Sequence, residues 1–167
     1  MGLGSLAGGY LADRLSQYKC LILFAWAELL IALFAISSKW LYYDLLYQTW
    51  PALSASLVTL SIVLFLSLLL PTFCMGLTLP LLSKALTRHL GEASFKIGWL
   101  YALNTLGAAL GALVTALLLV RHHGFVASLY VGAALNTAAM CGALLLAFLL
   151  ARSSYWEVRA HAPVPTR

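Results

Sequence analysis

The sequence predicts an all-α integral membrane protein, a polytopic bundle of transmembrane helices. Of the 167 residues, 63% are hydrophobic and only 9% are charged, whereas soluble domains carry about 25% charged residues. The apolar residues also form long runs, several of which reach the roughly 20 residues that a helix needs to cross a bilayer. This composition excludes an ordinary soluble domain. We expect about four full spans preceded by an N-terminal half-span.

The first apolar segment, residues 2–12, is rich in glycine and too short to cross a membrane. As a helix it rises about 16 Å, roughly half of the hydrocarbon core. A bare ammonium group is costly in hydrocarbon, so either the true start lies upstream or a neighbouring helix shields this half-span. Residues 13–19 then form a polar loop. Residues 20–38 make the first full span, with Glu28 near its middle.

An aromatic connector follows at residues 39–52, rich in the Trp and Tyr side chains that favour the headgroup level of a bilayer. Residues 53–83 form a second apolar run, which is too long for one straight crossing. Pro71 and Pro80 lie within it, and because proline removes a helical hydrogen bond we expect a kink or a break there. Residues 79–90 have an amphipathic pattern that favours a helix end at the interface.

The stretch from Trp99 to Val120 is apolar throughout and carries no charge. A helix of this length rises about 33 Å, enough for a full crossing. Gly107 and Gly111 form a small-xxx-small pattern, which lets two helix backbones approach closely in lipid. We therefore expect the other spans to pack around this one.

The last crossing follows a tight polar turn at residues 121–124 and covers residues 125–150. Residues 1–150 thus form one transmembrane helical domain. Residues 151–167 form a mixed tail that contains proline, and we expect its end to be poorly ordered.

The basic residues are distributed unevenly between the two sets of alternating loops. Those of the first set are Arg14, Lys19, Lys84, Arg88, Lys96, Arg152, Arg159 and Arg167, and those of the second set are Lys39 and Arg121. Because cytoplasmic loops carry the excess of Lys and Arg, the first set and the C-terminus are expected in the cytoplasm. The same scatter at the ends of apolar runs argues against nucleic acid as a partner, despite the net charge of +5.

Several stretches resemble known membrane proteins. Residues 9–14, GYLADR, resemble the loop signature G-x-L-A-D-R of major facilitator transporters, with Gly9, Asp13 and Arg14 at its fixed positions. Over residues 2–150 the chain resembles the membrane domain of the fused major-facilitator/spermidine synthase family. The stretches that carry this resemblance are GSLAGGYLADRLS, WAELLIALFA, LLLPTFCMGLTLPLLSKAL and IGWLYALNTLGAALGALVTALLLVRHHG.

This resemblance implies that the chain corresponds to the end of a second helix through a sixth helix, without the first helix and without the synthase domain. It therefore implies no synthase activity. Asp13 and Arg14 would cap the following helix and pair across cytoplasmic helix ends. Where transporters continue with Gly and two basic residues, this chain has Ser16, Gln17 and Tyr18. The resemblance therefore does not extend to a gating role for the loop.

Glu28 is the sharpest candidate for chemistry, because a carboxylate inside a span is a functional-site hypothesis by default. It could relay a proton or bind a cation, with Asn104 and Asn136 on other spans as partners. The alternative interpretation is a protonated or hydrogen-bonded glutamate that faces a neighbouring helix. Pro71 and Pro80 also allow two interpretations. They could break a helix to form a transport site, or they could produce a kink that serves helix packing.

Other reactive side chains give weaker signals. His122 and His123 could ligate a metal, but adjacent histidines point apart and no third ligand is near in sequence, so an interfacial loop is favoured. The cysteines lie in three different apolar segments without a CxxC pair, which favours reduced core residues: Cys20, Cys74 and Cys141. We see no nucleophile–base pair and no cofactor motif.

We therefore expect a protein that is not an enzyme and binds no catalytic cofactor, although a lipid, quinone or pigment could lie at an interface. One hypothesis is a structural or accessory subunit, in a bacterial inner membrane, that packs against other integral membrane subunits. The alternative is a half-size transporter that acts as a homodimer, for polyamines or other cations. Identity of the partner, oligomeric state and transported substrate are not encoded in these patterns.

Overall fold

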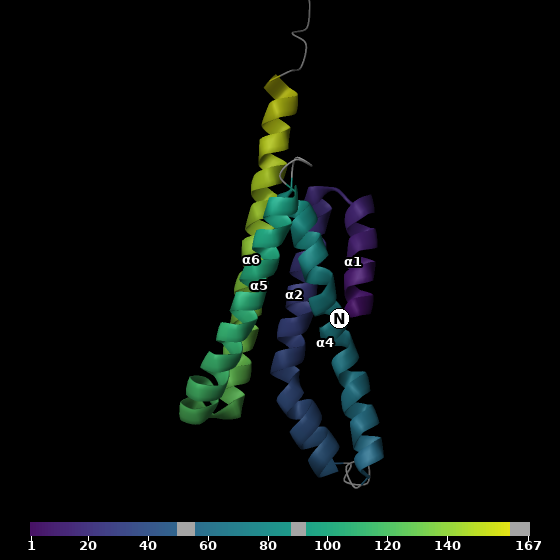
Figure 1. Ribbon diagram of the computed structural model, residues 1–167, viewed down its shortest axis with the longest axis vertical. Coiled ribbons are helices and arrows are strands. Elements are labelled where there is room, and N and C mark those ends of the chain that lie inside the picture. The colour runs from purple at the N-terminus through teal and green to yellow at the C-terminus, as the bar shows by residue number, and fades with distance from the viewer. Residues whose placement is uncertain (50–55, 88–92, 161–167) are drawn as a thin grey trace, which may run out of the picture.

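The computed structural model describes residues 1–49, 56–87 and 93–160, and Figure 1 shows the course of the chain. The regular secondary structure of these residues is entirely helical, which confirms the all-α fold class. In chain order the elements are α1 (Gly2–Arg14), α2 (Gln17–Lys39), the π-helix η1 (Trp40–Thr49), α4 (Leu57–Leu86), α5 (Ala93–Val114), the short π-helix η3 (Thr115–Leu119) and α6 (Val120–Ala160).

Three helical stretches within the described residues are long and apolar enough to cross a membrane: Gln17–Asp44, Leu57–Leu86 and Ser94–Arg152. The third is divided by Gly124, whose φ of 81° and ψ of 172° are not helical. Glycine adopts positive φ readily because it lacks Cβ. The chain reverses at this point, so that α5 and α6 run in opposite directions (Figure 1). The number of crossings remains a prediction.

α1 lies against α4 along a line of small residues. The buried positions of α1 are Gly4, Gly8 and Ala12. A methyl group added at Gly4 would overlap the carbonyl oxygen of Phe73, and one added at Gly76 would overlap the backbone of α1. α4 of the same chain therefore covers this face of α1.

Proline at position 80 explains a polar contact in this interface. Pro80 has no N–H, so the carbonyl of Gly76 receives no hydrogen bond from the residue four positions later. Ser5 Oγ of α1 donates a hydrogen bond of 3.2 Å to that same Gly76 oxygen. The seryl hydroxyl thus replaces a bond that lipid could not supply.

The predicted break in the second apolar run does not occur. α4 remains helical from Leu57 to Leu86 through both Pro71 and Pro80. Prolines are tolerated in transmembrane helices where neighbouring groups satisfy the freed carbonyls, as Ser5 does here. The kink at these prolines stays a prediction. Residues 79–86 belong to this helix, whereas residues 88–90 of the predicted interfacial segment lie outside the described residues.

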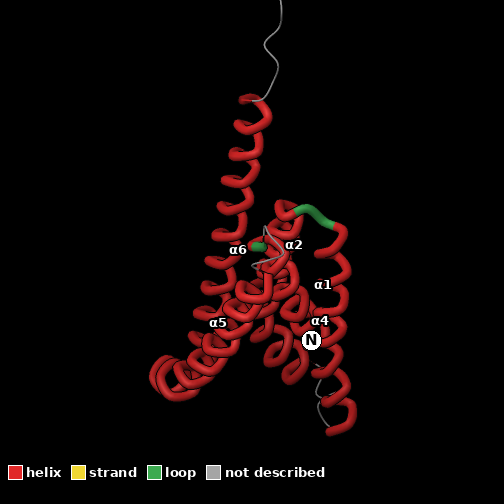
Figure 2. Tube along the Cα trace, turned by 45° about the horizontal axis from the view of Figure 1, so that its top comes forward, coloured by secondary structure: helices red, strands yellow, loops and turns green. Residues whose placement is uncertain are grey.

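The packing centre is α2, not the predicted span from Trp99 to Val120. α2 packs against both α4 and α6, whereas every residue from 101 to 118 is exposed and α5 contacts mainly η3 and α4. Figures 1 and 2 show α5 on the side away from α1. A helix that is apolar all round carries no sign of which face meets protein. The most deeply buried side chains are Cys20, Leu21 and Leu81.

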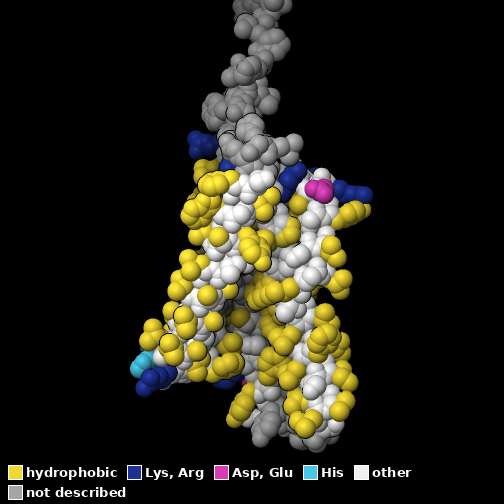
Figure 3. Space-filling model, in the orientation of Figure 1, with side chains coloured by type: hydrophobic (Ala, Val, Ile, Leu, Met, Phe, Trp, Pro, Cys, Tyr) yellow, Lys and Arg dark blue, Asp and Glu magenta, His cyan; other side chains and the backbone are white. Residues whose placement is uncertain are grey.

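The basic residues gather at two opposite ends of the bundle, as the alternating loops predicted. Dark blue side chains lie at the upper end in Figure 3, and a smaller group lies beside the histidines at the turn between α5 and α6. By the helix directions, the first end holds Arg14, Lys19, Lys84, Lys96 and Arg152, and the second holds Lys39 and Arg121. α6 continues to Ala160, beyond the expected end of the last span at residue 150.

The tight contact of α1 with α4 gives a test. We expect Gly4→Ala to lower the free energy of unfolding by about 1–3 kcal/mol, the usual cost of overpacking, because the new methyl group would meet backbone. Gly9→Ala on the same helix is the matched control, since a Cβ there meets nothing within 4 Å. Unfolding in mixed micelles, followed by circular dichroism, measures both. Equal stability of the two variants would contradict the observed interface.

Candidate functional site

Two adjoining cavities form a crevice between α2, α4 and α6. The inner cavity has a volume of about 340 Å³ and the outer one about 490 Å³, within the range of roughly 300–1,000 Å³ that small-molecule sites occupy. They share the side chains of Ser38, Tyr42 and Phe125, and we call them together the crevice. The remaining residues of the inner cavity are Ile31, Phe34, Ala35, Leu68, Pro71, Thr72, Met75, Ser128, Leu129, Gly132 and Asn136.

The seryl and threonyl hydroxyl groups in the wall of the inner cavity are already hydrogen-bonded within their own helices. Each donates to a carbonyl oxygen three or four residues earlier: Ser38 to Ala35 at 2.7 Å, Thr72 to Leu68 at 2.6 Å and Ser128 to Gly124 at 2.9 Å. Such back-bonding satisfies the hydroxyls without a ligand. The crevice is therefore apolar in character despite its serines and threonine.

Tyr42 joins η1 to α4 at the junction of the two cavities. Its hydroxyl lies 2.8 Å from Ser67 Oγ, and because Ser67 Oγ also donates to the carbonyl of Leu64 at 2.8 Å, Tyr42 is the donor. The ring of Tyr42 meets Phe34 edge-on, with centroids 6.4 Å apart and planes at 73°. This bridge positions the aromatic wall of the crevice.

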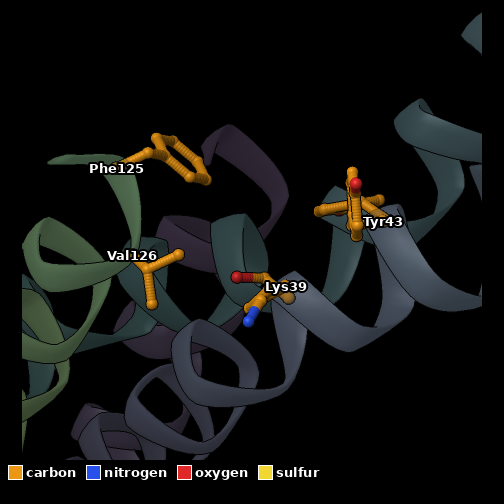
Figure 4. A pocket seen from close by; sticks show the side chains of 6 residues that line it. Lys39, Tyr43, Phe125 and Val126 are labelled. Carbon is orange, nitrogen blue, oxygen red and sulfur yellow. The ribbon is translucent and has the colours of Figure 1, made fainter.

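The outer cavity is lined from two sides, as Figure 4 shows. Lys39 and Tyr43 come from α2 and η1, and Phe125 and Val126 come from the beginning of α6. Lys39 makes no ion pair with any carboxylate in the described part of the chain. The outer opening thus combines aromatic rings with a positive charge.

The structure divides the predicted polar group of Glu28, Asn104 and Asn136. Glu28 is 9% exposed on α2, three residues before Ile31 of the inner cavity, and Asn136 lines that cavity from α6. Among the described residues, neither side chain has a hydrogen-bond or ion-pair partner. Asn104 is exposed on α5, away from both. Glu28 and Asn136 therefore lie on helices that pack together, and Asn104 does not join them.

The loop motif has a different role from the one that the resemblance implies. Asp13 is exposed, and the cap of α2 is Ser16, whose Oγ accepts a hydrogen bond of 3.5 Å from a backbone N–H in the first turn. Arg14 stacks over the ring of Tyr10, with its guanidinium carbon 4.1 Å from the ring centroid. Ser16 is one of the residues at which the chain departs from the transporter pattern. Gly9, the first motif position, faces open space.

Gly107 and Gly111 have no neighbour within 4 Å of an added Cβ, so their role in helix packing stays a prediction. The seam that the chain does use is Gly4, Gly8 and Ala12. The same spacing of four residues marks this seam in the sequence of the first segment.

The remaining candidates stay apart. His122 and His123 lie exposed at the Gly124 turn, and no group of three metal ligands occurs among the described residues. Cys20 and Cys74 are buried as expected. Cys141 is exposed, so the prediction of a core position is wrong for this residue, because it lies on a side of α6 that α2 does not cover.

No family model, no curated protein and no solved structure matches this chain. The resemblance to the fused major-facilitator/spermidine synthase family therefore remains a prediction that its motifs support. Fold and geometry define the class, an all-helical protein with helices of membrane-spanning length.

The bridge between Tyr42 and Ser67 can be tested by removing one hydroxyl. We expect Tyr42→Phe to lower the free energy of unfolding by about 0.5–1.5 kcal/mol, the net value of one hydrogen bond. Tyr101→Phe on the exposed helix α5 makes the same chemical change and should have no effect. Thermal unfolding in detergent compares them. A Tyr42→Phe protein as stable as Tyr101→Phe would show that the bridge does not hold η1 to α4.

Proposed function

We propose that this protein is a non-catalytic accessory subunit of an integral membrane complex, with a major-facilitator-like scaffold. The observation that supports this proposal is the exposure of the apolar helix α5. This helix is apolar and its residues from 101 to 118 are all exposed. A span held mainly by its chain neighbours leaves almost its whole circumference for another molecule.

The glycines of α5 favour protein over lipid as that neighbour. Lipid covers Leu and Val side chains as well as another helix does, so apolar surface alone distinguishes nothing. Small residues spaced by four, however, expose backbone on which a second helix can pack closely. Gly107 and Gly111 present such a face with open space in front of it. We infer that a helix of a partner subunit lies there.

The charge distribution supports an orientation for this subunit. The end of the bundle that holds Arg14, Lys19 and Lys84 would face the cytoplasm, following the positive-inside rule. The C-terminal end of α6 lies at the same end and would be cytoplasmic as well. A bacterial inner membrane is the location that the family resemblance favours.

Leucine substitution on α5 tests the accessory role. In mild detergent we expect the 18.1 kDa chain to elute with associated membrane proteins, and Gly107→Leu to abolish this association because the side chain blocks close approach. Gly98→Leu is the matched control, since Gly98 is also in open space but lies about 180° around the helix from Gly107. Size-exclusion chromatography with light scattering measures the assembly. A wild-type protein that elutes as a stable monomer contradicts the proposal.

A second candidate function, transport by a homodimer, is favoured by Glu28. This side chain is 9% exposed and lacks a partner among the described residues. Intramembrane carboxylates with this character often mark cation or proton pathways. Polyamines are the substrate class that the resemblance suggests.

Uptake of radiolabelled spermidine into proteoliposomes tests this candidate. If Glu28 binds the cation, Glu28→Gln should abolish uptake, because the neutral amide cannot replace the charge. Asp13→Asn, which neutralises an exposed carboxylate, should leave uptake unchanged. Absence of uptake by the wild-type protein, or equal uptake by Glu28→Gln, eliminates the transport function.

A further inference from the structure

We propose that the crevice between α2, α4 and α6 binds one anionic bilayer lipid, with an acyl chain in the inner cavity and the headgroup at Lys39. This inference does not depend on the accessory role. It requires only that the helices stand in a bilayer, and it rests on the length, the wall chemistry and the charge of the crevice.

The length of the crevice matches one leaflet. Its wall on α2 and η1 extends from Tyr42 inward to Ile31, which are eleven residue steps apart, or about 16 Å at the helical rise. Half of a hydrocarbon core is about 15 Å. A lipid of the leaflet at the Lys39 end would therefore place its chain along the crevice without leaving its normal depth.

The wall suits a hydrocarbon chain. Phe34, Leu68 and Leu129 supply apolar surface. The seryl and threonyl hydroxyls are hydrogen-bonded within their own helices, and the Tyr42 hydroxyl is bonded to Ser67. Asn136 lies at the inner end, where its carboxamide ends the apolar wall. Between Tyr42 and Asn136 the wall offers no free polar side chain to a ligand, which an acyl chain does not need.

The charge at the outer opening selects the headgroup. Lys39 lines the outer cavity and has no carboxylate partner among the described residues. Arg121 lies at the same end, four residues before Phe125 and on the other side of the reversal at Gly124, and Asp44 is the one acidic residue described at this end. The balance at this end is positive, and a lysine near a membrane surface attracts anionic lipid. An anionic phospholipid is therefore favoured over a zwitterionic one.

A glycine in the wall of the inner cavity provides the variant that tests occupancy. Gly132 lines the inner cavity, and a Cβ added there meets nothing within 4 Å. A leucine at this position would enter the crevice without displacing backbone. Gly142 of the same helix is equally open but does not line the crevice, so Gly142→Leu is the matched control.

Native mass spectrometry of the purified chain measures the lipid. After delipidation we would add palmitoyl-oleoyl phosphatidylglycerol or the corresponding phosphatidylcholine at equal concentration. The wild-type protein and Gly142→Leu should retain one phosphatidylglycerol, and Gly132→Leu should retain none. Lys39→Gln should weaken phosphatidylglycerol binding by about fivefold, the factor expected for the loss of one basic residue near an anionic membrane surface. It should leave phosphatidylcholine binding unchanged.

Two results would overturn the proposal. Equal lipid retention by Gly132→Leu and Gly142→Leu would show that the crevice is not the binding site. Equal affinity of the wild-type protein for both lipids would show that Lys39 does not select the headgroup. Because Lys39 is an exposed side chain, the Lys39→Gln protein should fold. The comparison of the two lipids therefore tests the proposal even if Gly132→Leu fails to fold.

Discussion

Close packing of small residues is the constraint on which the described bundle depends. In lipid two apolar helices gain no hydrophobic energy by meeting, so contact requires backbones that approach closely. The interfaces follow this rule, with buried small residues on all four packed helices: Gly4, Gly8 and Ala12 on α1, Ala25 and Ala32 on α2, Gly76 and Ala85 on α4, and Ala143 and Ala147 on α6. On α5 the glycines at positions 98, 107 and 111 face open space within the described part of the chain.

The helices were predictable from the sequence because length and apolarity decide what can stand in a bilayer. The reversal at Gly124 was predictable as well, since a polar turn with a glycine separates two apolar runs. The identity of the central helix of the bundle was not predictable from the sequence. The segments 20–38 and 99–120 are both apolar around their circumference, and composition cannot tell a face that meets protein from one that meets lipid. Only the three-dimensional contacts single out α2.

The candidate site shows the same limit. A carboxylate inside an apolar run singles out Glu28 from the sequence alone, and its side chain is 9% exposed. The crevice is assembled from three segments far apart in the chain, and its bridge from Tyr42 to Ser67 spans 25 residues. No local pattern marks such a site. The crevice and the glycine face of α5 are separate surfaces, so a bound lipid and a partner helix would not compete.

The bond from Ser5 to Gly76 has a consequence for biosynthesis. The two residues are 71 positions apart, and α1 emerges from the ribosome well before the helix that covers it. During that interval the face of α1 that α4 covers, with Gly4, Gly8 and Ala12, is open. Once Pro80 is in place, the Gly76 carbonyl has no backbone donor from the next turn of its own helix. Docking of α1 on α4 covers the first face and supplies the missing donor through Ser5.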